Sequence, residues 1–544
     1  MEKWWQDRVV YQIYPRSFAD TDGDGIGDIP GITAHLDDLK DLGVGVIWLS
    51  PVYSSPDADN GYDISDYRSI DPKYGTLEDM ENLIREAASR DIRIVMDLVI
   101  NHTSDEHEWF LKSRDKGSPY RDYYIWRPGK NGGPPNNWTS FFGEDCWEFD
   151  DKSGEYYLHL FAKKQPDLNY HNPKVLEEIK DIMRFWLDKG VGGFRCDVIN
   201  VIFKTSLADG KKKLALTGSE HYISQEGAHE ILRALRREVL SAYDCFAVGE
   251  TVFVTPQMGG DLCGQNRGEL DMIFSFEHME TDQFFIKWFK RPFSPGRFGR
   301  TIAKWQNALE WNANYLENHD QPRSVSRFGN DGRFWAESAK LLCVLLLTLR
   351  GTPFIYQGQE IGMTNFDFTG MEQVRDVESL NIYRLAKKLH IPGFLRWRMI
   401  KKTSRDNART PMQWNAGENA GFTTGTPWLK INGNYTRINM AGQIDDPDSV
   451  RSFYKKMIAL RAGSEVLKYG AFRLIRASGK LFVYEREMNG KTFRILLNFG
   501  KRPAKVFCGG DVLVSNYGRA QLDGKLLPFE AVVIEKGRGN DNGG

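Results

Sequence analysis

Short apolar runs recur along most of the chain, and they are rich in β-branched and aromatic residues. Such runs are too short for helices and are typical of strands that are buried on both faces of a parallel sheet. We expect eight of them, at residues 9–14, 44–50, 92–98, 193–197, 246–250, 272–276, 313–317 and 353–356. Helical patterns lie between many of these runs, for example at 77–89, 175–189 and 227–240. This alternation of strand and helix predicts a (β/α)₈ TIM barrel.

Two gaps between the expected strands are unusually long. Residues 103–170 follow strand three and are rich in Trp, Tyr, Gly and Pro, and residues 361–450 follow strand eight. From residue 465 onward, short strand patterns are separated by Gly, Asn and Asp, which indicates an antiparallel β-sandwich. We therefore expect a barrel domain at 1–102 and 171–464, an inserted subdomain at 103–170 and a C-terminal all-β domain at 465–544.

Composition narrows the class of protein. The formal net charge is −1, which argues against nucleic acid as a partner. The longest apolar stretch, residues 341–349, is too short to cross a bilayer, and the N-terminus lacks the pattern of a signal peptide. The six cysteines are scattered and form no CxxC motif, as in a reduced protein. We expect a cytoplasmic monomer that acts on a small molecule and binds neither nucleic acid nor membrane.

Three acidic residues stand at the ends of expected strands. Asp197 ends strand four, Glu250 ends strand five and Asp320 follows strand seven. The carboxyl ends of the strands of a barrel form its active-site face. Cleavage of a glycosidic bond with retention of configuration uses two carboxyl groups about 5 Å apart. A single acid at a strand end is more often a helix cap or one half of an ion pair, so only the combination is informative.

The segments around these acids resemble the four short regions of glycoside hydrolase family 13, the α-amylase superfamily. They are Asp-Leu-Val-Ile-Asn-His at 97–102, Gly-Phe-Arg-Cys-Asp-Val at 193–198, Val-Gly-Glu-Thr at 248–251 and Glu-Asn-His-Asp at 317–320. Residues 10–18, 59–63 and 405–414 also match, and the similarity covers nearly the whole chain. Within the family, the sequence is most similar to the branch of oligo-1,6-glucosidases, dextran glucosidases and α-glucosidases.

The resemblance implies a role for each matching residue. Asp197 would be the nucleophile, Glu250 the general acid/base and Asp320 the third carboxylate, which binds two sugar hydroxyls and stabilises the transition state. Arg195 would hold the nucleophile ionised, because it lies on the same face of the strand. His102 and His319 would bind hydroxyls of the cleaved glucose, and Tyr62 would stack on its ring. Asp59 and Arg405 would hold its far hydroxyls and so close the pocket behind a single glucose. Phe161 and Gln165 would line the pocket.

The resemblance also bears on the linkage that is cleaved. Val198 follows the nucleophile, and in this family Val at that position accompanies α-1,6 specificity, whereas Ala or Thr accompanies α-1,4 bonds and sucrose. Lys287 and Glu378 match residues that contact the +1 sugar, the sugar beyond the cleaved bond. The expected reaction is release of glucose from the non-reducing end of isomaltooligosaccharides.

Other activities within the family remain open at this stage. They are broad α-1,4 specificity, trehalose-6-phosphate hydrolysis, in which the lysine run 211–213 would bind phosphate, and sucrose isomerisation, for which the segment 323–327 is a weak match. A non-catalytic, transporter-associated homologue is disfavoured, because such proteins have a membrane helix and lack some of the three acids.

An acidic loop follows the first expected strand. Its sequence, Asp-Thr-Asp-Gly-Asp-Gly-Ile-Gly-Asp at 20–28, alternates carboxylates with glycines that favour turns. Hard oxygen ligands at this spacing suit Ca²⁺. The resemblance implies a structural calcium site formed by the side chains of Asp20, Asp22, Asp24 and Asp28 and the carbonyl of Ile26. We expect no organic cofactor.

Overall fold

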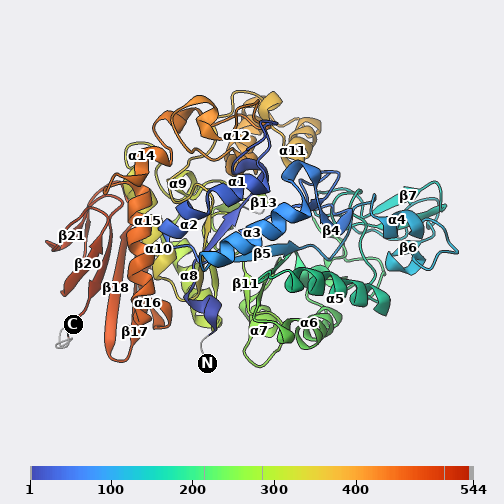
Figure 1. Ribbon diagram of the computed structural model, residues 1–544, viewed down its shortest axis with the longest axis horizontal. Helices are drawn as coiled ribbons and strands as arrows, with labels where there is room; N and C mark the ends of the chain where they lie inside the picture. Colours follow the sequence, from blue (N-terminus) through green and yellow to red (C-terminus); the bar gives the residue numbers. More distant parts are fainter. Residues whose placement is uncertain (1–2, 214, 285, 508, 538–544) are drawn as a thin grey trace. The chain divides into compact units, whose positions relative to one another are not determined.

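The structure, a computed structural model, describes residues 3–213, 215–284, 286–507 and 509–537 (Figure 1). Its central feature is an eight-stranded sheet with the order β11-β10-β9-β5-β2-β1-β15-β14. The strand pairs β5–β9, β9–β10, β10–β11, β1–β15 and β14–β15 are all parallel. The (β/α)₈ barrel class predicted from the sequence is confirmed.

The ends of each barrel strand agree with its expected range to within two residues. The eight strands are β1 (Val10–Ile13), β2 (Val46–Leu49), β5 (Arg93–Leu98), β9 (Gly193–Cys196), β10 (Phe246–Glu250), β11 (Met272–Phe274), β14 (Ala313–Tyr315) and β15 (Thr352–Tyr356). Nearly every residue in them is buried, which explains why the strands read as continuous apolar runs rather than as alternating ones.

The chain divides into two compact units, which we describe separately. Unit 1 comprises Met1–Gly27, Ala34–Ile47 and Glu277–Gly544, and unit 2 comprises Asp28–Thr33 and Trp48–Phe276.

In unit 2, helices begin at recognisable caps. Helix α3 (Leu77–Ser89) starts at Thr76, whose hydroxyl accepts a hydrogen bond from the Asp79 N–H, while the Asp79 carboxylate accepts one from the Thr76 N–H. Helix α5 (Pro173–Asp188) is capped by Asn172 and has Pro at its first position. Helices α6 (Glu226–Glu238) and α7 (Pro256–Cys263) complete the barrel layer of this unit.

Residues 103–170 of unit 2 contain a small helix and a small sheet. Helix α4 (Glu108–Ser113) precedes an antiparallel sheet with the order β6-β8-β7, made of β6 (Trp126–Arg127), β7 (Trp147–Asp150) and β8 (Glu155–Leu158). Phe110 stacks on Trp126 and meets Tyr157 edge-on. The aromatic residues that are abundant in this segment therefore form its core.

In unit 1, an antiparallel C-terminal sheet follows the last barrel helices. The strands β16 (Ala471–Ser478), β17 (Leu481–Met488), β18 (Lys491–Asn498), β22 (Ala531–Glu535) and β20 (Asp511–Ser515) pair in that order. A second pair, β19 (Ala504–Lys505) and β21 (Lys525–Leu526), adds Leu526 to the same apolar cluster. Asn489 and Gly490 both have positive φ between β17 and β18, as a tight hairpin turn requires. The predicted C-terminal antiparallel fold is confirmed.

Helices of unit 1 pack on this sheet and carry part of the candidate site. Helix α8 (Pro295–Ala308) contacts β16, and helix α10 (Trp335–Thr348) contacts β18 and β22 (Figure 1). The long segment after β15 contains α11 (Val377–Lys388), α12 (Gly393–Thr403), α13 (Asp406–Arg409) and α14 (Ala441–Ile444), and α15 (Val450–Ala462) follows it.

The described residues bear on two expectations, namely that no segment crosses a membrane and that the cysteines are reduced. No helix in the described ranges combines the length and apolar character needed to cross a bilayer. Cys146, Cys196, Cys245 and Cys343 are free thiols, and Cys508 lies outside the described residues.

Candidate active site

Arg195 joins the acidic side chains at the strand ends of unit 2. Its Nη1 lies 2.6 Å from a carboxylate oxygen of Asp97 and 2.6 Å from one of Asp197, and its Nη2 lies 2.7 Å from Glu250. Strand register produces this grouping, because Arg195 of β9 is level with Asp97 of β5 and with Val248 of β10. Three carboxylates from three adjacent strands therefore share one buried guanidinium.

Asp197 and Glu250 form a coupled acidic pair. Burial raises the pKa of Asp197, Arg195 lowers it, and the neighbouring Glu250 raises it again, so that the pKa lies well above its usual range. We predicted that Arg195 would hold Asp197 ionised. Arg195 does act in that direction, but it is shared with two other carboxylates, and burial outweighs it. Arg195 and Glu250 therefore act on the pKa of Asp197 in opposite directions.

Asp97, which the sequence analysis did not assign to the site, orients Arg195. Its second carboxylate oxygen accepts hydrogen bonds from Trp48 Nε1 at 3.2 Å and from the Tyr62 hydroxyl at 3.1 Å. Burial raises the pKa of Asp97 to about 6, against the opposing effect of Arg195. The guanidinium also lies over the rings of Trp48 and Tyr62, 5.2 and 5.7 Å from their centroids. Tyr62 is thus a neighbour of the acidic cluster, as a residue of the sugar pocket should be.

Val198 has an unusual backbone conformation. Its φ of 35° and ψ of 39° lie in the left-handed region, which β-branched residues rarely occupy. The conformation directs its N–H toward Glu250 Oε2, 3.3 Å away. Strain of this kind persists at functional sites, where the surrounding structure holds it in place.

The other predicted pocket residues of unit 2 meet around His102. Gln165 Nε2 lies 3.1 Å from His102 Nε2, 3.2 Å from the Tyr62 carbonyl and 3.4 Å from an Asp59 carboxylate oxygen. The ring of Phe161 is 5.2 Å from that of His102. Burial lowers the pKa of His102 to about 4, so its imidazole is neutral at physiological pH and suited to hydrogen bonding.

In unit 1, Asp320 lies among basic side chains. Arg409 Nη2 donates a hydrogen bond to its carboxylate at 2.6 Å, and Arg405 Nη1 and His319 Nε2 lie 3.5 Å from it. Burial opposes ionisation, but His319, Arg405 and Arg409 together hold the pKa of Asp320 far below its usual range. Asp320 is therefore an ionised carboxylate rather than a proton donor.

Residues of β1 and of the turn after it hold His319 in place. Gln12 Nε2 lies 2.8 Å from His319 Nδ1, and the ring of Tyr14 stacks on the imidazole at an interplanar angle of 7°. Sequence reasoning did not identify Gln12, Tyr14 or Arg409. Gln12 and Tyr14 lie within the matched segment 10–18, and Arg409 lies within 405–414. The similarity of these segments to the family could therefore have identified all three as site residues.

The expected +1 residues form a charged group in unit 1. Lys287, on β13 (Ile286–Lys290), is ion-paired with Glu378 of α11. Arg405 Nε lies 2.8 Å from Asp376 and 3.9 Å from Glu378. Lys287, Glu378 and Arg405, which are distant in sequence, thus lie together, a grouping that the sequence analysis did not predict.

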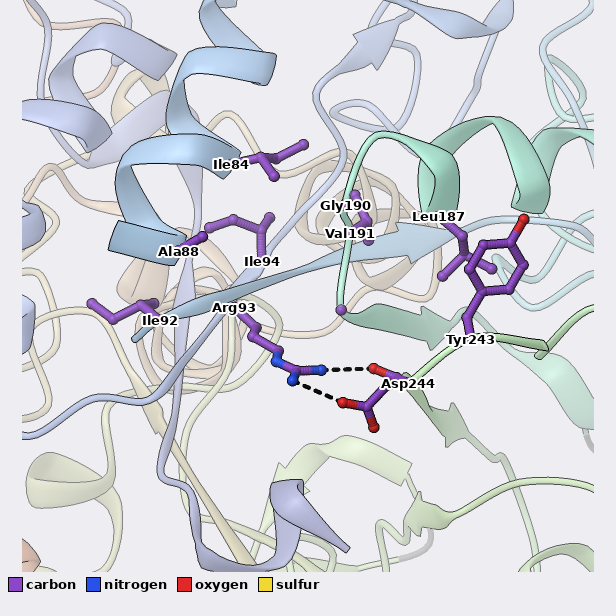
Figure 2. A pocket seen from close by; sticks show the side chains of 11 residues that line it. Ile84, Ala88, Ile92, Arg93, Ile94, Leu187, Gly190, Val191, Tyr243 and Asp244 are labelled. Carbon is purple, nitrogen blue, oxygen red and sulfur yellow. Dashed lines mark hydrogen bonds and ion pairs between the residues drawn. The ribbon is translucent and has the colours of Figure 1, made fainter. Parts of the chain in front are cut away.

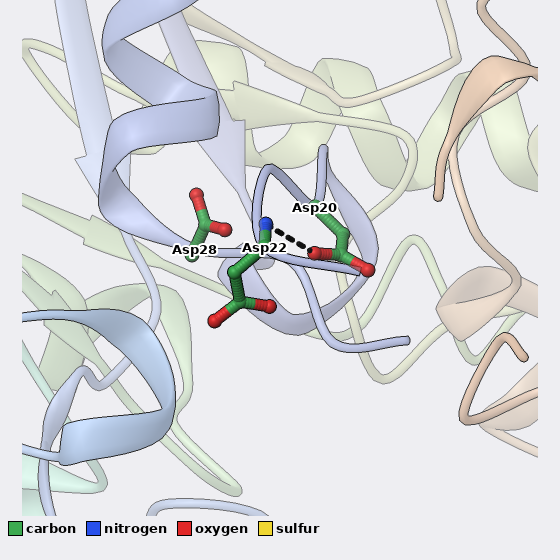
Figure 3. A group of neighbouring side chains, drawn as sticks. All are labelled: Asp20, Asp22 and Asp28. Atoms are coloured by element: carbon green, nitrogen blue, oxygen red, sulfur yellow. Dashed lines mark hydrogen bonds between the residues drawn. The ribbon is translucent and has the colours of Figure 1, made fainter. Parts of the chain in front are cut away.

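The acidic loop folds tightly around its first aspartate. Asp20 accepts hydrogen bonds from the N–H groups of Asp22 and Gly23 on one oxygen and from that of Gly25 on the other. Oxygens of Asp20, Asp22 and Asp28 lie within 4.8 Å of one another (Figure 3). This spacing is compatible with common ligation of one cation at Ca²⁺–oxygen distances of about 2.3–2.6 Å.

A separate cavity of about 250 Å³ lies at the opposite, amino-terminal ends of β5 and β9 (Figure 2). Its walls are mostly aliphatic, and its charged groups are Arg93 and Asp244, which form an ion pair with a 2.8 Å contact. Residues at this face of a barrel usually contribute to stability rather than to catalysis. We do not assign this cavity to the active site.

Comparison with known proteins places the site in a family. Residues 12–470 match the family model of the α-amylase catalytic domain. The chain belongs to the α-amylase family of glycoside hydrolases.

Individual relatives extend the match to the whole chain. An oligo-1,6-glucosidase of Parageobacillus thermoglucosidasius is 50% identical over 556 residues, covering 98% of this chain and 99% of the relative. The crystal structure of Bacillus licheniformis trehalose-6-phosphate hydrolase superposes with a TM-score of 0.94 at 42% identity, covering 98% of this chain and 100% of that one. A trehalulose synthase variant in complex with Tris superposes with a TM-score of 0.95, also at 42% identity, with coverages of 98% and 100%.

Proposed function

We propose that the protein is a retaining, exo-acting α-glucosidase that cleaves α-1,6 bonds at the non-reducing end of isomaltooligosaccharides. The observation that carries the proposal is the pairing of Asp197 and Glu250 through one guanidinium, with contacts of 2.6 and 2.7 Å. Carboxyl groups bound to the two ends of one planar group lie close together, as double displacement requires.

In the first proposed step, an Asp197 oxygen attacks the anomeric carbon while protonated Glu250 transfers its proton to the departing glycosidic oxygen. The aglycone leaves, and glucose is bonded to Asp197. In the second step, ionised Glu250 takes a proton from water, the water oxygen attacks the same carbon, and the Asp197 carboxylate is released. The shared Arg195 guanidinium suits this exchange, because it is placed to compensate negative charge on either carboxylate as the proton moves.

Asp320 is proposed to bind two hydroxyls of the cleaved glucose, with Asp59 and Arg405 at its far side. The ionisation of Asp320 supports this role, because a fixed negative charge stabilises a developing oxocarbenium ion.

Phosphate recognition by the lysine run 211–213 is less well supported. Lys213 Nζ lies 2.8 Å from a carboxylate oxygen of Glu220 and 2.7 Å from the Ser219 hydroxyl. A phosphate would have to displace this carboxylate. The α-1,6 proposal is therefore preferred to trehalose-6-phosphate hydrolysis.

Sucrose isomerisation is disfavoured by the structural use of the arginines in 323–327. Arg323 is fully buried and is bonded to Glu317 and to the Gln357 carbonyl. Arg327 is 2.8 Å from Asp282. Both guanidiniums are engaged within the protein, which leaves them poorly suited to directing a released fructose.

A structural Ca²⁺ is a further part of the proposal. The side chains of Asp20, Asp22, Asp24 and Asp28 and the Ile26 carbonyl would hold the ion, and the spacing of three of these carboxylates is suitable. When bound, the ion would neutralise the charges of the loop. We also propose that the protein is a cytoplasmic monomer. The buried thiols of Cys146, Cys196 and Cys343 support a reducing compartment.

A side-by-side measurement of kcat/KM on isomaltose, panose, maltose, sucrose, trehalose and trehalose-6-phosphate tests the function. We expect glucose release from isomaltose and panose, and little action on maltose. Equal or faster cleavage of maltose would refute the α-1,6 assignment and leave an α-glucosidase. Preference for the phosphorylated disaccharide, or conversion of sucrose to an isomer, would select one of the alternatives.

A further inference from the structure

Asp376 connects Arg405 with Glu378, two residues of unit 1. The family resemblance assigns Arg405 to the cleaved glucose and Glu378 to the +1 sugar. The Asp376 side chain is fully buried, and Asp376 is the N-cap of α11, the helix that carries Glu378. Oδ1 accepts hydrogen bonds from Arg405 Nε at 2.8 Å and from the Glu378 N–H at 3.2 Å. A single carboxylate oxygen therefore touches both the Arg405 side chain and the backbone of Glu378.

The second oxygen of Asp376 strengthens both connections. Oδ2 accepts from the Ser379 hydroxyl at 2.5 Å, from the Ser379 N–H at 3.3 Å and from the Arg405 N–H at 3.3 Å. With both oxygens occupied, the carboxylate has little freedom to rotate. The position of the first turn of α11 is thereby tied to the position of Arg405.

Asp376 is itself held by a neighbouring acid. The Asp406 carboxylate accepts hydrogen bonds from the N–H groups of Asp376 at 3.0 Å and of Arg375 at 2.7 Å. Asp406 follows Arg405 directly, so the start of α13 and the start of α11 are linked in both directions. Such a reciprocal connection is more than an isolated helix cap needs.

Arg405 and Glu378, the two residues that Asp376 contacts, have different partners. Arg405 directs Nη1 toward Asp320, at 3.5 Å, and Glu378 is ion-paired with Lys287. Because its Nε is bonded to Asp376, the guanidinium plane of Arg405 is fixed. The direction of the Glu378 side chain depends on where the first turn of α11 begins.

We propose that Asp376 is a positioning residue that holds both Arg405 and Glu378. It thereby couples binding of the cleaved glucose by Arg405 to recognition of the +1 sugar by Glu378. The inference rests on the proposed function and on the family resemblance, which assigns Arg405 to the cleaved glucose and Glu378 to the +1 sugar. Asp376 contacts no substrate in this account and acts only through its neighbours.

The test compares a substrate that uses both subsites with one that uses mainly the first. Isomaltose occupies both, whereas p-nitrophenyl α-glucoside offers no sugar hydroxyls at +1. Asp376→Asn preserves the size of the side chain and can still cap α11, but it removes the charge. We expect kcat/KM to fall about 10-fold on the aryl glucoside and about 100-fold on isomaltose, in line with loss of charged hydrogen bonds.

A double-mutant cycle with Glu378→Gln separates positioning from simple loss of stability. Once Glu378 is altered, Asp376→Asn should lower kcat/KM on isomaltose only by the smaller factor seen with the aryl glucoside. Equal losses on both substrates, or an undiminished loss in the Glu378→Gln background, would overturn the proposal. If Asp376→Asn does not fold, Ser379→Ala removes one of the bonds to Oδ2 and should shift the same ratio in the same direction by a few-fold.

Ser449→Ala is the matched control. Ser449 caps α15 through a 3.0 Å hydrogen bond from the Ser452 N–H, so the variant loses a buried cap elsewhere in unit 1. Its Tm should fall, and its ratio of rates on the two substrates should not change. If the wild-type protein prefers maltose, the α-1,6 assignment is refuted. The double-mutant cycle can then still be measured with maltose in place of isomaltose. The two failures are therefore distinguishable.

Discussion

The backbone N–H of Val198 donates a hydrogen bond to the carboxylate of Glu250, with the nitrogen and oxygen 3.3 Å apart. The left-handed conformation of Val198 makes this contact possible, and its side chain packs in a buried cluster with Trp138, Val201 and Tyr222. The residue that follows the proposed nucleophile therefore contacts the proposed acid directly. A change of side chain at this position can alter both the shape of the +1 side and the setting of Glu250.

Substitution Val198→Ala should shift linkage preference. Loss of the branched side chain opens space beside the +1 sugar, so the ratio of kcat/KM for maltose to that for isomaltose should rise several-fold. Steady-state kinetics on the two disaccharides would measure it. Val201→Ala removes the same two methyl groups from the same cluster and should leave the ratio unchanged. An equal shift in both variants would show that packing, rather than the position of Val198, is responsible.

The two members of the acidic pair should respond differently to neutral substitutions. Asp197→Asn should lower turnover by about 10⁴-fold or more on every substrate, because no covalent intermediate can form. Glu250→Gln should lose about 10²–10⁴-fold on isomaltose but much less in the first step on p-nitrophenyl α-glucoside, whose leaving group needs no proton. A burst of nitrophenol followed by slow turnover is the signal to look for.

Cys196→Ala is the control for these variants. Burial raises the pKa of this thiol to about 12, so it is not a thiolate nucleophile at neutral pH. The variant should retain most of its activity. Rapid turnover by Asp197→Asn, or inactivity of Cys196→Ala in a folded protein, would contradict the assignment of the nucleophile.

A buried acid of unit 1 should make stability depend on pH. Burial raises the pKa of Glu360 to about 7, and its Oε1 accepts a hydrogen bond from the Tyr11 hydroxyl at 2.9 Å. Because the folded-state pKa exceeds that of the unfolded chain, the stabilising contribution is complete below about pH 4.5 and is lost as the pH rises through about 7. The Tm should therefore fall between about pH 5 and 8.

Glu360→Gln should reduce this slope, since the amide does not ionise. Each unit of pKa difference corresponds to about 1.4 kcal/mol. Between about pH 5 and 8, the free energy of unfolding of the variant should therefore fall by a few kcal/mol less than that of the wild type. Thermal unfolding at several pH values is the measurement, with exposed Glu418→Gln as the control. Parallel Tm profiles for wild type and Glu360→Gln would mean that the acid does not govern the pH response.

Removal of calcium should destabilise the protein without changing its chemistry. A ligand that binds only the folded state adds about 2.7 kcal/mol at 100 times its Kd, so a chelator should lower the Tm of a chain of this length by about 2 °C. Asp22→Asn should abolish that response, whereas Asp445→Asn, at an exposed position, should retain it. A Tm that is identical with and without chelator would rule out a calcium site of useful affinity.

Much of the fold could be predicted because local signals agree with the final structure. The apolar run at 92–98 became β5, and the pattern at 77–89 became α3 with the same bounds, because a capping box and a buried stripe at Met80, Leu83, Ile84 and Ala87 reinforce each other. The contacts between site residues could not be predicted in the same way. Asp376, for example, precedes Glu378 by two positions, and nothing in that spacing indicates that its carboxylate binds Arg405.

The sequence by itself determined the barrel, the position of the acids at strand ends and the family to which the chain belongs, because strand periodicity and short motifs are local properties. Only the tertiary structure decided how those acids are partnered. Arg195 is shared among Asp97, Asp197 and Glu250, and Asp320 is paired with Arg409, which lies far from it in sequence. Electrostatic effects depend on distance in space and on burial, and neither can be read from the order of residues along the chain.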